Sequence, residues 1–579
     1  MLKQCFFLYK RMIFLYVVMG FLAQFCTTYG IKLFQEIVDK VPAANDLNEV
    51  ASLVMLYGAL LAGAAALHYL TNYPDTYLSN SIAEKVKIMA LVKVSRMDYS
   101  TYQRIGTGEM IKIIENGASA GTSIIHSFYL RIFHELLPTL VFSLVFISLY
   151  NRNIMLVIAA GYVVIFFINH ILLRWLYRIK SSLLTSQEQM GKFAIRGFME
   201  LVVFRINKRY EKEIKRLHNT AGDIVMKSTQ IKMIHESFFA IFALLVHMIK
   251  VVVLIYGIRQ IMSGESSIGV IIALILFIDQ VYTPVAIFNV LYVEYKLNRV
   301  TYTRLEEFVN AREDHNLEAG REVKALKGSI EFRNVAFDYG DSKLLSGITF
   351  SIKQGSSVAI VGLSGSGKST IVKLMLGLLK KKAGSITWDG IEMDELKLNS
   401  LYDHVSYISQ EAPIFDTTLR ENIVFDNEVP DERVYEILDL VHLKEKVLSF
   451  PDGLNTTVGE RGMKLSGGER QRLAFGRIIA QQRNVVMLDE PVSALDNITE
   501  KGIMDGILTM FSGKTLIIVA HRLQFIQEVD KILLVKDGEI VGDGDFDYLI
   551  RNSAYFQELW HKELRNESDS IALSYGGCK

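Results

Sequence analysis

The chain has 579 residues, of which 50% are hydrophobic, and its formal net charge at neutral pH is only +1. This near-neutral balance gives no argument for nucleic-acid binding or for an acidic substrate. Cys5, Cys26 and Cys578 lie far apart and lack the spacing of metal ligands, so we expect incidental thiols in a reducing compartment.

Six apolar runs in the first half are long enough to cross a membrane, given the ~20 residues that a ~30 Å hydrocarbon core requires. They lie near residues 12–34, 50–72, 133–150, 154–173, 237–261 and 268–292. The third run is the weakest, because His134 and Glu135 stand at its start. The first follows Lys3, Lys10 and Arg11 but is too long for a signal peptide, so we expect a retained membrane helix.

Basic residues are unevenly distributed among the connectors between these runs. The segment from Arg174 to Lys232 carries thirteen Lys or Arg and the segment from Lys85 to Arg131 carries seven, whereas each short connector carries one. Because basic connectors stay on the cytoplasmic side, we expect the two long connectors, the N-terminus and the second half of the chain to be cytoplasmic.

The two long connectors have the composition of helices, with almost no Gly or Pro in segments such as Ile82–Met97 and Glu200–His218. Structureless connectors of this length are uncommon. We therefore expect the membrane helices to continue into the cytoplasm and to turn back at Asp98–Gly108 and near Val202–Arg209.

Two charged residues, Lys250 and Asp279, fall inside the fifth and sixth runs. At ~1.5 Å per helical residue, both lie ~21–23 Å from the turn near Gly264. Charges in a membrane rarely face lipid unpaired. We expect both side chains to face the protein interior, either as a direct pair or lining an aqueous cavity.

The composition changes abruptly at Asn310–Lys327, which is charged and poor in large apolar residues. We therefore predict a membrane domain at 1–310, a linker at 311–327, a soluble α/β domain at 328–564 and a polar, mobile tail at 565–579.

The soluble domain contains a P-loop pattern, G-x-x-x-x-G-K-[ST], between an expected strand at Ser357–Val361 and an expected helix at Ile371–Leu379. Backbone N–H groups of such a loop surround phosphate oxygens, its lysine reaches the β- and γ-phosphates and its first hydroxyl binds Mg²⁺. The loop residues are Gly362, Leu363, Ser364, Gly365, Ser366, Gly367, Lys368, Ser369 and Thr370.

Three further motifs follow about a hundred residues downstream. Leu465–Arg472 is a glycine-rich turn that opens a basic helix, where backbone amides and a serine hydroxyl can bind a phosphate. Val485–Glu490 is an apolar run ending in two carboxylates, as in a buried parallel strand, and Ser493–Asp496 then turns the chain. Each motif alone is common, but their occurrence by chance in this order after a P-loop is remote.

The order of these motifs, completed by Ala520–Arg522, resembles the nucleotide-binding domain of an ABC transporter, and the resemblance covers nearly all of the second half. The six runs, with Tyr102–Glu109 similar to the first coupling region, resemble the exporter-type (type IV) fold of that family. The resemblance implies a half-transporter in which an all-α, six-helix transmembrane domain precedes an α/β P-loop ATPase domain.

The resemblance also implies roles for individual residues. Tyr339 would stack on adenine, and Gln410 would contact both Mg²⁺ and the membrane domain. Glu490 would polarise the attacking water, Asp489 would support Mg²⁺ through its water shell, and His521 would contact the γ-phosphate beside Lys368.

The signature turn in this family closes on the ATP of a second subunit, so Ser466, Gly467 and Gly468 would act in trans. Thr457–Gly462 is similar to the family's X-loop, although Thr457 stands where glutamate is usual. One chain would then be half of the transporter, with a homodimer expected and a heterodimer as the alternative.

The implied function is ATP hydrolysis coupled to alternating access of the membrane helices. The expected substrate is an amphipathic lipid, drug or peptide that is exported, in a bacterial inner membrane. An importer on the same fold and an ATP-gated channel or regulator are the alternatives. The intact Lys368, Glu490, Ser466 and His521 favour a pump over a gate, and the six apolar runs exclude a soluble ABC ATPase acting on nucleic acid or ribosomes.

Overall fold

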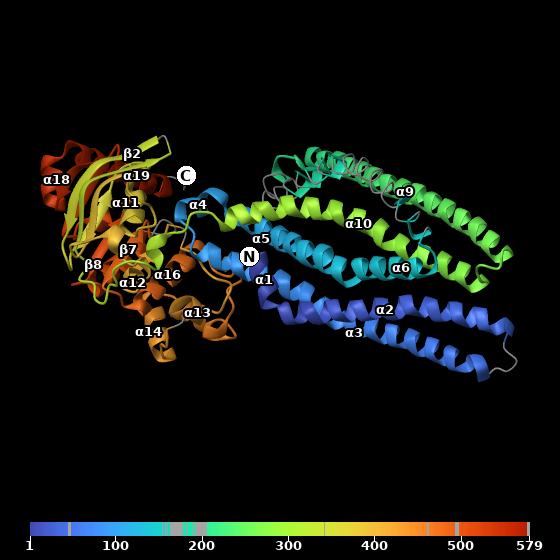
Figure 1. Ribbon diagram of the computed structural model, residues 1–579. Helices are drawn as coiled ribbons and strands as arrows, with labels where there is room; N and C mark the ends of the chain where they lie inside the picture. The colour runs from blue at the N-terminus through green and yellow to red at the C-terminus, as the bar shows by residue number, and fades with distance from the viewer. Residues whose placement is uncertain are drawn as a thin grey trace. The chain divides into compact units, whose positions relative to one another are not determined.

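The computed structural model describes residues 1–575, with the exception of 44–47, 153, 157, 159, 162–177, 181, 184, 188, 192–204, 341, 411, 426, 460–461, 492–496 and 521. The chain folds into two units. The first consists of Met1–Ser95 and Ile105–Ala311, and the second of Arg96–Arg104 and Arg312–Lys579. Figure 1 shows the first unit as long helices and the second as a mixture of sheets and helices. The predicted fold class, a helical domain followed by an α/β domain, is confirmed.

Long helices make up the described part of the first unit. They are α1 (Leu2–Leu8), α2 (Lys10–Lys40), α3 (Asn48–Ser95), α5 (Thr107–Thr122), α6 (Leu137–Tyr150), α9 (Tyr210–Met262) and α10 (Ile268–Val309), with a 3-10 turn at Val41–Ala43. Five described stretches are long and apolar enough to cross a membrane: Lys10–Lys40, Val50–Ser95, Thr107–Tyr150, Tyr210–Met262 and Ile268–Val309. They contain five of the six predicted spans. The fourth, at 154–173, falls largely outside the described residues.

Several of these helices are longer than a membrane span, as the helical composition of the connectors predicts. α3 has 48 residues and α9 has 53, whereas ~20 residues cross the hydrocarbon core. The first predicted break coincides with the segment between α3 and α5. The second, near Val202–Arg209, is described only from residue 205, and a turn there precedes α9.

The third membrane-crossing stretch changes its helical pitch between α5 and α6. The backbone is π-helical over η2 (Ser123–Leu130) and η3 (Ile132–Leu136). The π-helix is rare in proteins, and where it occurs it is often at a functional site. Two histidines of this stretch contact residues of other helices. His126 Nε2 lies 3.0 Å from Asp75 Oδ1 on α3, and the Nδ1–H of the buried His134 donates to the carbonyl oxygen of Tyr16 on α2 at 2.8 Å.

Further packing in this unit joins α2, α6, α9 and α10. Aromatic residues of three helices, Phe146, Phe242 and Phe277, are buried in one cluster. A polar network lies beside it. Gln280 on α10 accepts a hydrogen bond from Ser143 on α6 at 3.2 Å and donates one to Thr28 on α2 at 2.9 Å. The single glutamine therefore fixes the relative positions of three helices.

The second unit contains two sheets. A four-stranded antiparallel sheet has the order β2-β1-β4-β5, with β1 (Ile330–Tyr339), β2 (Ser342–Ile352), β4 (Ala383–Trp388) and β5 (Ile391–Glu392). A six-stranded sheet has the order β10-β9-β3-β8-β7-β6, with β3 (Ser357–Val361), β6 (Val405–Ile408), β7 (Val485–Asp489), β8 (Thr515–Val519), β9 (Lys531–Lys536) and β10 (Glu539–Gly544). All neighbours in this sheet are parallel except β9 and β10. The predicted strand at Ser357–Val361 is confirmed, and Asp537-Gly538 forms the turn between the antiparallel strands β9 and β10.

Helices flank both sheets. They are α11 (Lys368–Met375), α12 (Leu398–Tyr402), α13 (Leu419–Val424), α14 (Asp431–Leu440), α15 (Lys444–Leu448), α16 (Gly467–Gln481), α17 (Asn497–Met510), α18 (Phe546–Asn552) and α19 (Ala554–Tyr575). Short 3-10 turns lie at His315–Leu317, Met393–Glu395, Gly453–Asn455 and Leu523–Ile526. The predicted tail from residue 565 begins inside α19, which ends at Tyr575.

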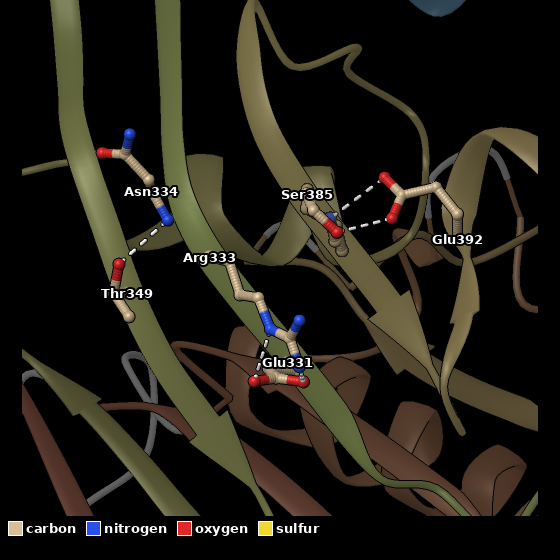
Figure 2. Close-up of polar contacts among 7 residues, drawn as sticks. Glu331, Arg333, Asn334, Thr349, Ser385 and Glu392 are labelled. Atoms are coloured by element: carbon tan, nitrogen blue, oxygen red, sulfur yellow. Dashed lines mark hydrogen bonds and ion pairs between the residues drawn. The ribbon is translucent and has the colours of Figure 1, made fainter.

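Strand β1 contains a bulge that side chains stabilise (Figure 2). The pairing with β2 shifts between Phe332 and Val335, and Asn334 has a positive φ of 50°. The Asn334 N–H donates to Thr349 Oγ1 at 2.9 Å. On the neighbouring strands, Ser385 Oγ donates to Glu392 Oε2 at 2.5 Å. The Thr349 hydroxyl therefore gives the Asn334 N–H a partner at the bulge, where the strand pairing is interrupted.

The second unit includes Arg96–Arg104, which contains only the first three residues of the predicted coupling region Tyr102–Glu109. Met97 pairs with Glu313 in an antiparallel bridge, and the Asp98 N–H donates to the carbonyl oxygen of Arg312 at 3.1 Å. The helix α4 (Tyr99–Ile105) follows, and Tyr99 packs against the apolar core of this unit. The segment 96–104 is therefore part of the second unit by its contacts, although in sequence it lies between two long helices of the first unit.

Candidate functional site

The P-loop connects the buried strand β3 to the N-terminus of α11. Gly362, Gly365 and Gly367 have positive φ angles of 154°, 82° and 106°. A Cβ at Gly362 would lie 2.1 Å from the carbonyl oxygen of Val535, so only glycine fits there. The loop thus brings its backbone to the start of a helix, where N–H groups and the helix dipole favour an anion.

Lys368 is the first residue of α11 and is 4% exposed. Its Nζ donates to the carbonyl oxygens of Gly362 and Leu363, both at 3.0 Å, so the ammonium lies over the loop. Burial lowers the pKa of Lys368, while the carboxylates of Glu490 and Asp489 oppose this shift. The nearby carboxylates therefore help to keep a positive charge at the point where phosphates would bind.

Residues from three other stretches meet beside the loop. Ser369 Oγ donates to Oδ1 of Asp489, the last residue of β7, at 3.0 Å. Gln410, which follows β6, donates from Nε2 to Glu490 Oε2 at 2.7 Å. Burial raises the pKa of Asp489, and the hydrogen bond from Ser369 opposes this shift. The residues that the sequence assigns to Mg²⁺ and to water activation thus form one site.

The two neighbouring carboxylates differ in environment. Asp489 is buried within the strand, whereas Glu490 is half-buried and has a positive φ of 51°. Such a backbone conformation is unfavourable for residues other than glycine and persists where the surrounding structure enforces it. Because the backbone turns at Glu490, the Asp489 carboxylate contacts Ser369 and the Glu490 carboxylate contacts Gln410.

The remaining predicted residues have different outcomes. Tyr339 ends β1 and packs edge-on against Phe337. It is 45% exposed, so its ring is open to a base, as the expected stacking on adenine requires. Ser466 is the N-cap of α16, and its hydroxyl accepts from the Glu469 N–H at 3.2 Å. Gly467 and Gly468 open that helix. His521, Glu460–Arg461 of the X-loop and the whole of Ser493–Asp496 lie outside the described residues.

The residues present fit a nucleoside triphosphate with Mg²⁺. Ser366 Oγ is buried in the loop and has no hydrogen-bond partner among the described residues, so it can donate to a phosphate. The glycines leave the backbone open to close approach. Ser369, Asp489 and Gln410 offer the oxygen ligands that Mg²⁺ prefers, directly or through water.

In the membrane unit, Lys250 on α9 and Asp279 on α10 form an ion pair between Nζ and Oδ1. Of the two arrangements expected from their equal depth, a direct pair or two charges lining an aqueous cavity, the structure has the direct pair. The Lys250 side chain is 19% exposed and that of Asp279 is 54% exposed. The Lys250 side chain is thus largely buried by the surrounding helices, whereas about half of the Asp279 side chain is exposed.

One contact near the nucleotide site is absent from the sequence-based prediction. Glu563 on α19 accepts hydrogen bonds from the backbone of Leu523 and Gln524, just after His521 in sequence. The sequence around Glu563 has the pattern of an ordinary C-terminal helix and does not predict this contact.

Comparison with known proteins identifies the family. The family model "ABC transporter transmembrane region" matches residues 13–285, and the model "ABC transporter" matches residues 345–493. Together they span more than half of the chain. This chain belongs to the ABC transporter family.

Similar proteins come from bacteria and eukaryotes. An uncharacterized ABC transporter ATP-binding protein, YwjA, of Bacillus subtilis is 28% identical over 523 residues, covering 88% of this chain and 89% of the relative. ATP-binding cassette sub-family B member 6 of Xenopus tropicalis is 27% identical over 553 residues, covering 93% of this chain but 64% of the frog protein. A solved bacterial Atm1-family ABC exporter with ATP bound has a TM-score of 0.82, with 21% identity, covering 96% of this chain and 98% of that one.

These findings support the predicted organisation. The solved structure shows that this ABC transporter has the fold of an exporter with its membrane and ATP-binding parts in one chain. The five apolar helices and the match to the transmembrane region show a multi-pass membrane protein. The match to the ATP-binding domain implies ATP binding and ATP-driven transport.

Proposed function

We propose that this ABC transporter is one half of an exporter that hydrolyses Mg²⁺-bound ATP to move an amphipathic solute out of the cytoplasm. The observation that carries the proposal is the convergence of Lys368, Ser369, Gln410, Asp489 and Glu490 on one site, in a chain with membrane-crossing helices.

Catalysis follows from the positions of these side chains. Bound Mg²⁺-ATP supplies the phosphoanhydride that is cleaved and the metal that neutralises its charge. Lys368 and the P-loop amides would stabilise negative charge on the β- and γ-phosphates, while Ser369 and Asp489 would hold the metal directly or through water. Glu490, oriented by the Gln410 amide at 2.7 Å, accepts a hydrogen bond from the attacking water. The resemblance to the family assigns His521 to the γ-phosphate.

The working unit of the proposal is a homodimer. The hydrogen bonds of Ser466 lie within its own helix, where they hold Gly467 and Gly468 at the helix start. That helix start offers N–H groups to a phosphate of the second subunit's ATP. All parts of one composite site occur in this one sequence, so two copies suffice, and a heterodimeric partner is not needed to complete the site.

Relatives support an amphipathic substrate. Similar proteins are named as a lipid A-core flippase of Saccharophagus degradans, a multidrug resistance transporter of Lactococcus lactis and a mitochondrial iron–sulfur clusters transporter of rat. The first two names favour lipid-like or drug-like solutes. The bacterial relatives also favour a bacterial inner membrane as the location, with the ATPase unit in the cytoplasm.

Lys250 and Asp279 belong to the same proposal. The pair fixes the relative depth of α9 and α10, and the open side of Asp279 faces a polar region rather than lipid, because an exposed mid-membrane carboxylate is costly.

Two measurements test the proposal. Purified protein in nanodiscs should hydrolyse ATP, and a screen of lipids, drugs and peptides should find solutes that stimulate the rate. Inverted vesicles should accumulate such a solute when ATP is added. Accumulation by right-side-out cells instead would show import, and ATPase activity without any solute movement would support the channel or regulator.

A further inference from the structure

A polar network joins three helices of the membrane unit at one end. Asp39, on the last turn of α2, accepts from two groups at the start of α10: Ser267 Oγ donates to Oδ2 at 2.6 Å, and the Gly269 N–H donates to Oδ1 at 2.8 Å. Gln35, one turn earlier on α2, donates from Nε2 to Asp39 Oδ2 at 2.5 Å. Gln35 also accepts from the hydroxyl of Tyr150, the last residue of α6, at 2.9 Å. One carboxylate thus ties α2 to α10, and its neighbour extends the network to α6.

This end of the helices is the one that we expect on the non-cytoplasmic side. Asp39 follows the first apolar run, Tyr150 ends the third and Ser267 precedes the sixth, so all three border short connectors. The long basic connectors, which we expect in the cytoplasm, lie at the opposite ends of the runs. An exporter must open on the non-cytoplasmic side to release its solute, so a contact that holds helices together there opposes release.

The close approach of α10 to α2 depends on a glycine. Gly269 is buried, and a Cβ there would lie 2.6 Å from Asp39 Oδ1 and 2.7 Å from the carbonyl oxygen of Gln35. A larger residue would push the two helices apart. The N-terminus of α10 also carries partial positive charge, which favours a carboxylate in front of it. Shape and charge therefore both place the Asp39 carboxylate at the first turn of α10.

The contact can break without leaving α10 uncapped. Ser267 is the N-cap of α10, and its Oγ accepts from the Val270 N–H at 3.3 Å. Asp39 and Ser267 are partly exposed, so water can replace the hydrogen bonds between them. Deeper in the unit, α2 and α10 are joined by Gln280 and the fully buried Thr28. The contact at Asp39 is therefore easier to open than the buried contact below it.

We propose that Asp39 is a gating residue of the transporter. Its carboxylate holds α2 and α10 together while the non-cytoplasmic side is closed, and the contact breaks for each release of solute. The proposal rests on the proposed export function. A hydrogen bond to a charged group shifts a two-state equilibrium about tenfold to a hundredfold. Loss of the carboxylate should therefore raise the equilibrium constant for opening by about that factor.

The first experiment measures opening through a buried reporter, Ala273→Cys, in a chain whose three native cysteines are replaced by alanine. Ala273 is 1% exposed and lies one turn after Gly269, on the same face of α10. A membrane-impermeant thiol reagent is added to right-side-out vesicles, where it reaches only the non-cytoplasmic side. We expect Asp39→Ala to speed labelling at least about tenfold. Glu265→Ala removes an exposed carboxylate from the connector before α10 and is the control, which should label at the parent rate.

Equal labelling of Asp39→Ala and its parent would show that Asp39 does not hold this end closed. Should Asp39→Ala fail to fold, Asp39→Asn is measured instead. It keeps one accepting oxygen but loses the charge, so we expect a smaller increase in the labelling rate, of at least about threefold. An unchanged rate in Asp39→Asn would then contradict the proposal.

The second experiment asks whether the contact has to break. In the cysteine-free chain without the reporter, Asp39→Cys and Ser267→Cys place two thiols where Oδ2 and Oγ lie 2.6 Å apart. A short bifunctional thiol reagent that can be cleaved by reduction joins them. ATP-driven accumulation of solute in inverted vesicles should fall at least about tenfold in the linked protein and return on reduction, with ATP binding unchanged. Each single cysteine variant, treated in the same way, should keep its untreated rate.

The two experiments separate the gating role from the export function. If linked protein transports at the unlinked rate, α2 and α10 need not separate at Asp39, and the gating role fails while export stands. If unlinked protein accumulates no solute in inverted vesicles, the export function fails. The labelling rate needs neither solute nor ATP hydrolysis, so it still shows whether Asp39 holds this end of the helices closed.

Discussion

At the scale of single residues, the adjacent carboxylates Asp489 and Glu490 have different hydrogen-bond partners. The buried Asp489 accepts from Ser369, on the side where Mg²⁺ would bind. Glu490, turned by its positive φ, is contacted by Gln410. A glutamine at position 490 would keep the hydrogen bond to Gln410 but could no longer act as a base.

We therefore expect Glu490→Gln to abolish turnover while ATP binding is preserved and a closed dimer accumulates. The measurement is ATP hydrolysis by purified protein, together with retention of labelled ATP after gel filtration. Glu539→Gln, at an exposed position of β10, is a control that should hydrolyse ATP at the wild-type rate. Hydrolysis by Glu490→Gln within about threefold of wild type would show that Glu490 does not activate the water.

At the scale of elements, the sequence predicts the strands and helices whose positions depend on neighbouring residues in the chain. β3 and β7 are short apolar runs next to polar motifs, and both occur where the sequence predicts them. α11 begins at Lys368 and ends at Met375, earlier than the predicted Leu379, because Gly377 takes a positive φ and stops the helix.

Contacts between distant elements could not be predicted from these patterns. His134 makes the third span look weak in sequence, but its ring is buried against Tyr16, with centroids 4.0 Å apart. Glu563 resembles any surface glutamate until the backbone of Leu523 is seen beside it. The Lys250–Asp279 pair could be predicted because the hairpin at Gly264 gives both residues the same depth.

Gly20 on α2 makes room for His134. A Cβ at Gly20 would lie 2.0 Å from His134 Nδ1, whereas a Cβ at Gly58 on α3 would meet no atom within 4 Å. We expect Gly20→Ala to displace the imidazole and to destabilise the membrane unit by about 1–3 kcal/mol, as overpacking does. Gly58→Ala is the matched control and should change stability by no more than about 0.5 kcal/mol. Thermal unfolding in detergent compares the two, and equal unfolding temperatures would contradict the role of Gly20.

The ion pair between α9 and α10 allows a charge-swap experiment. Lys250→Asp and Asp279→Lys each place two like charges together within the membrane, so each single variant should lose folding or transport. The double variant restores opposite charges. If it recovers both folding and transport, the pair serves to align the helices. If it folds but does not transport, the charges contact the substrate. Unchanged expression and transport in both single variants would contradict the importance of the pair.

At the scale of the whole molecule, the two units are covalently joined at three points, since residues 96–104 belong to the ATPase unit while α3 and α5 belong to the membrane unit. A movement of the ATPase unit therefore acts on α3, α5 and α10 through continuous backbone. Closure of two ATPase units on ATP requires a second subunit, because the signature turn acts in trans in the proposed dimer.

Complementation between two damaged chains tests this arrangement. Lys368→Ala removes the P-loop cation, and Ser466→Arg places a bulky side chain at the signature turn, so homodimers of either variant should be inactive. In a mixed dimer with trans sites, one site receives both defects and the other receives none. We expect co-expressed, tandem-purified mixed dimers, with twice the 65.6 kDa chain mass, to regain ATPase activity up to about half of the wild-type rate. If each site were formed within one chain, both sites of the mixed dimer would be defective and no activity would return. A purified wild-type monomer without ATPase activity would instead indicate that a different partner chain is required.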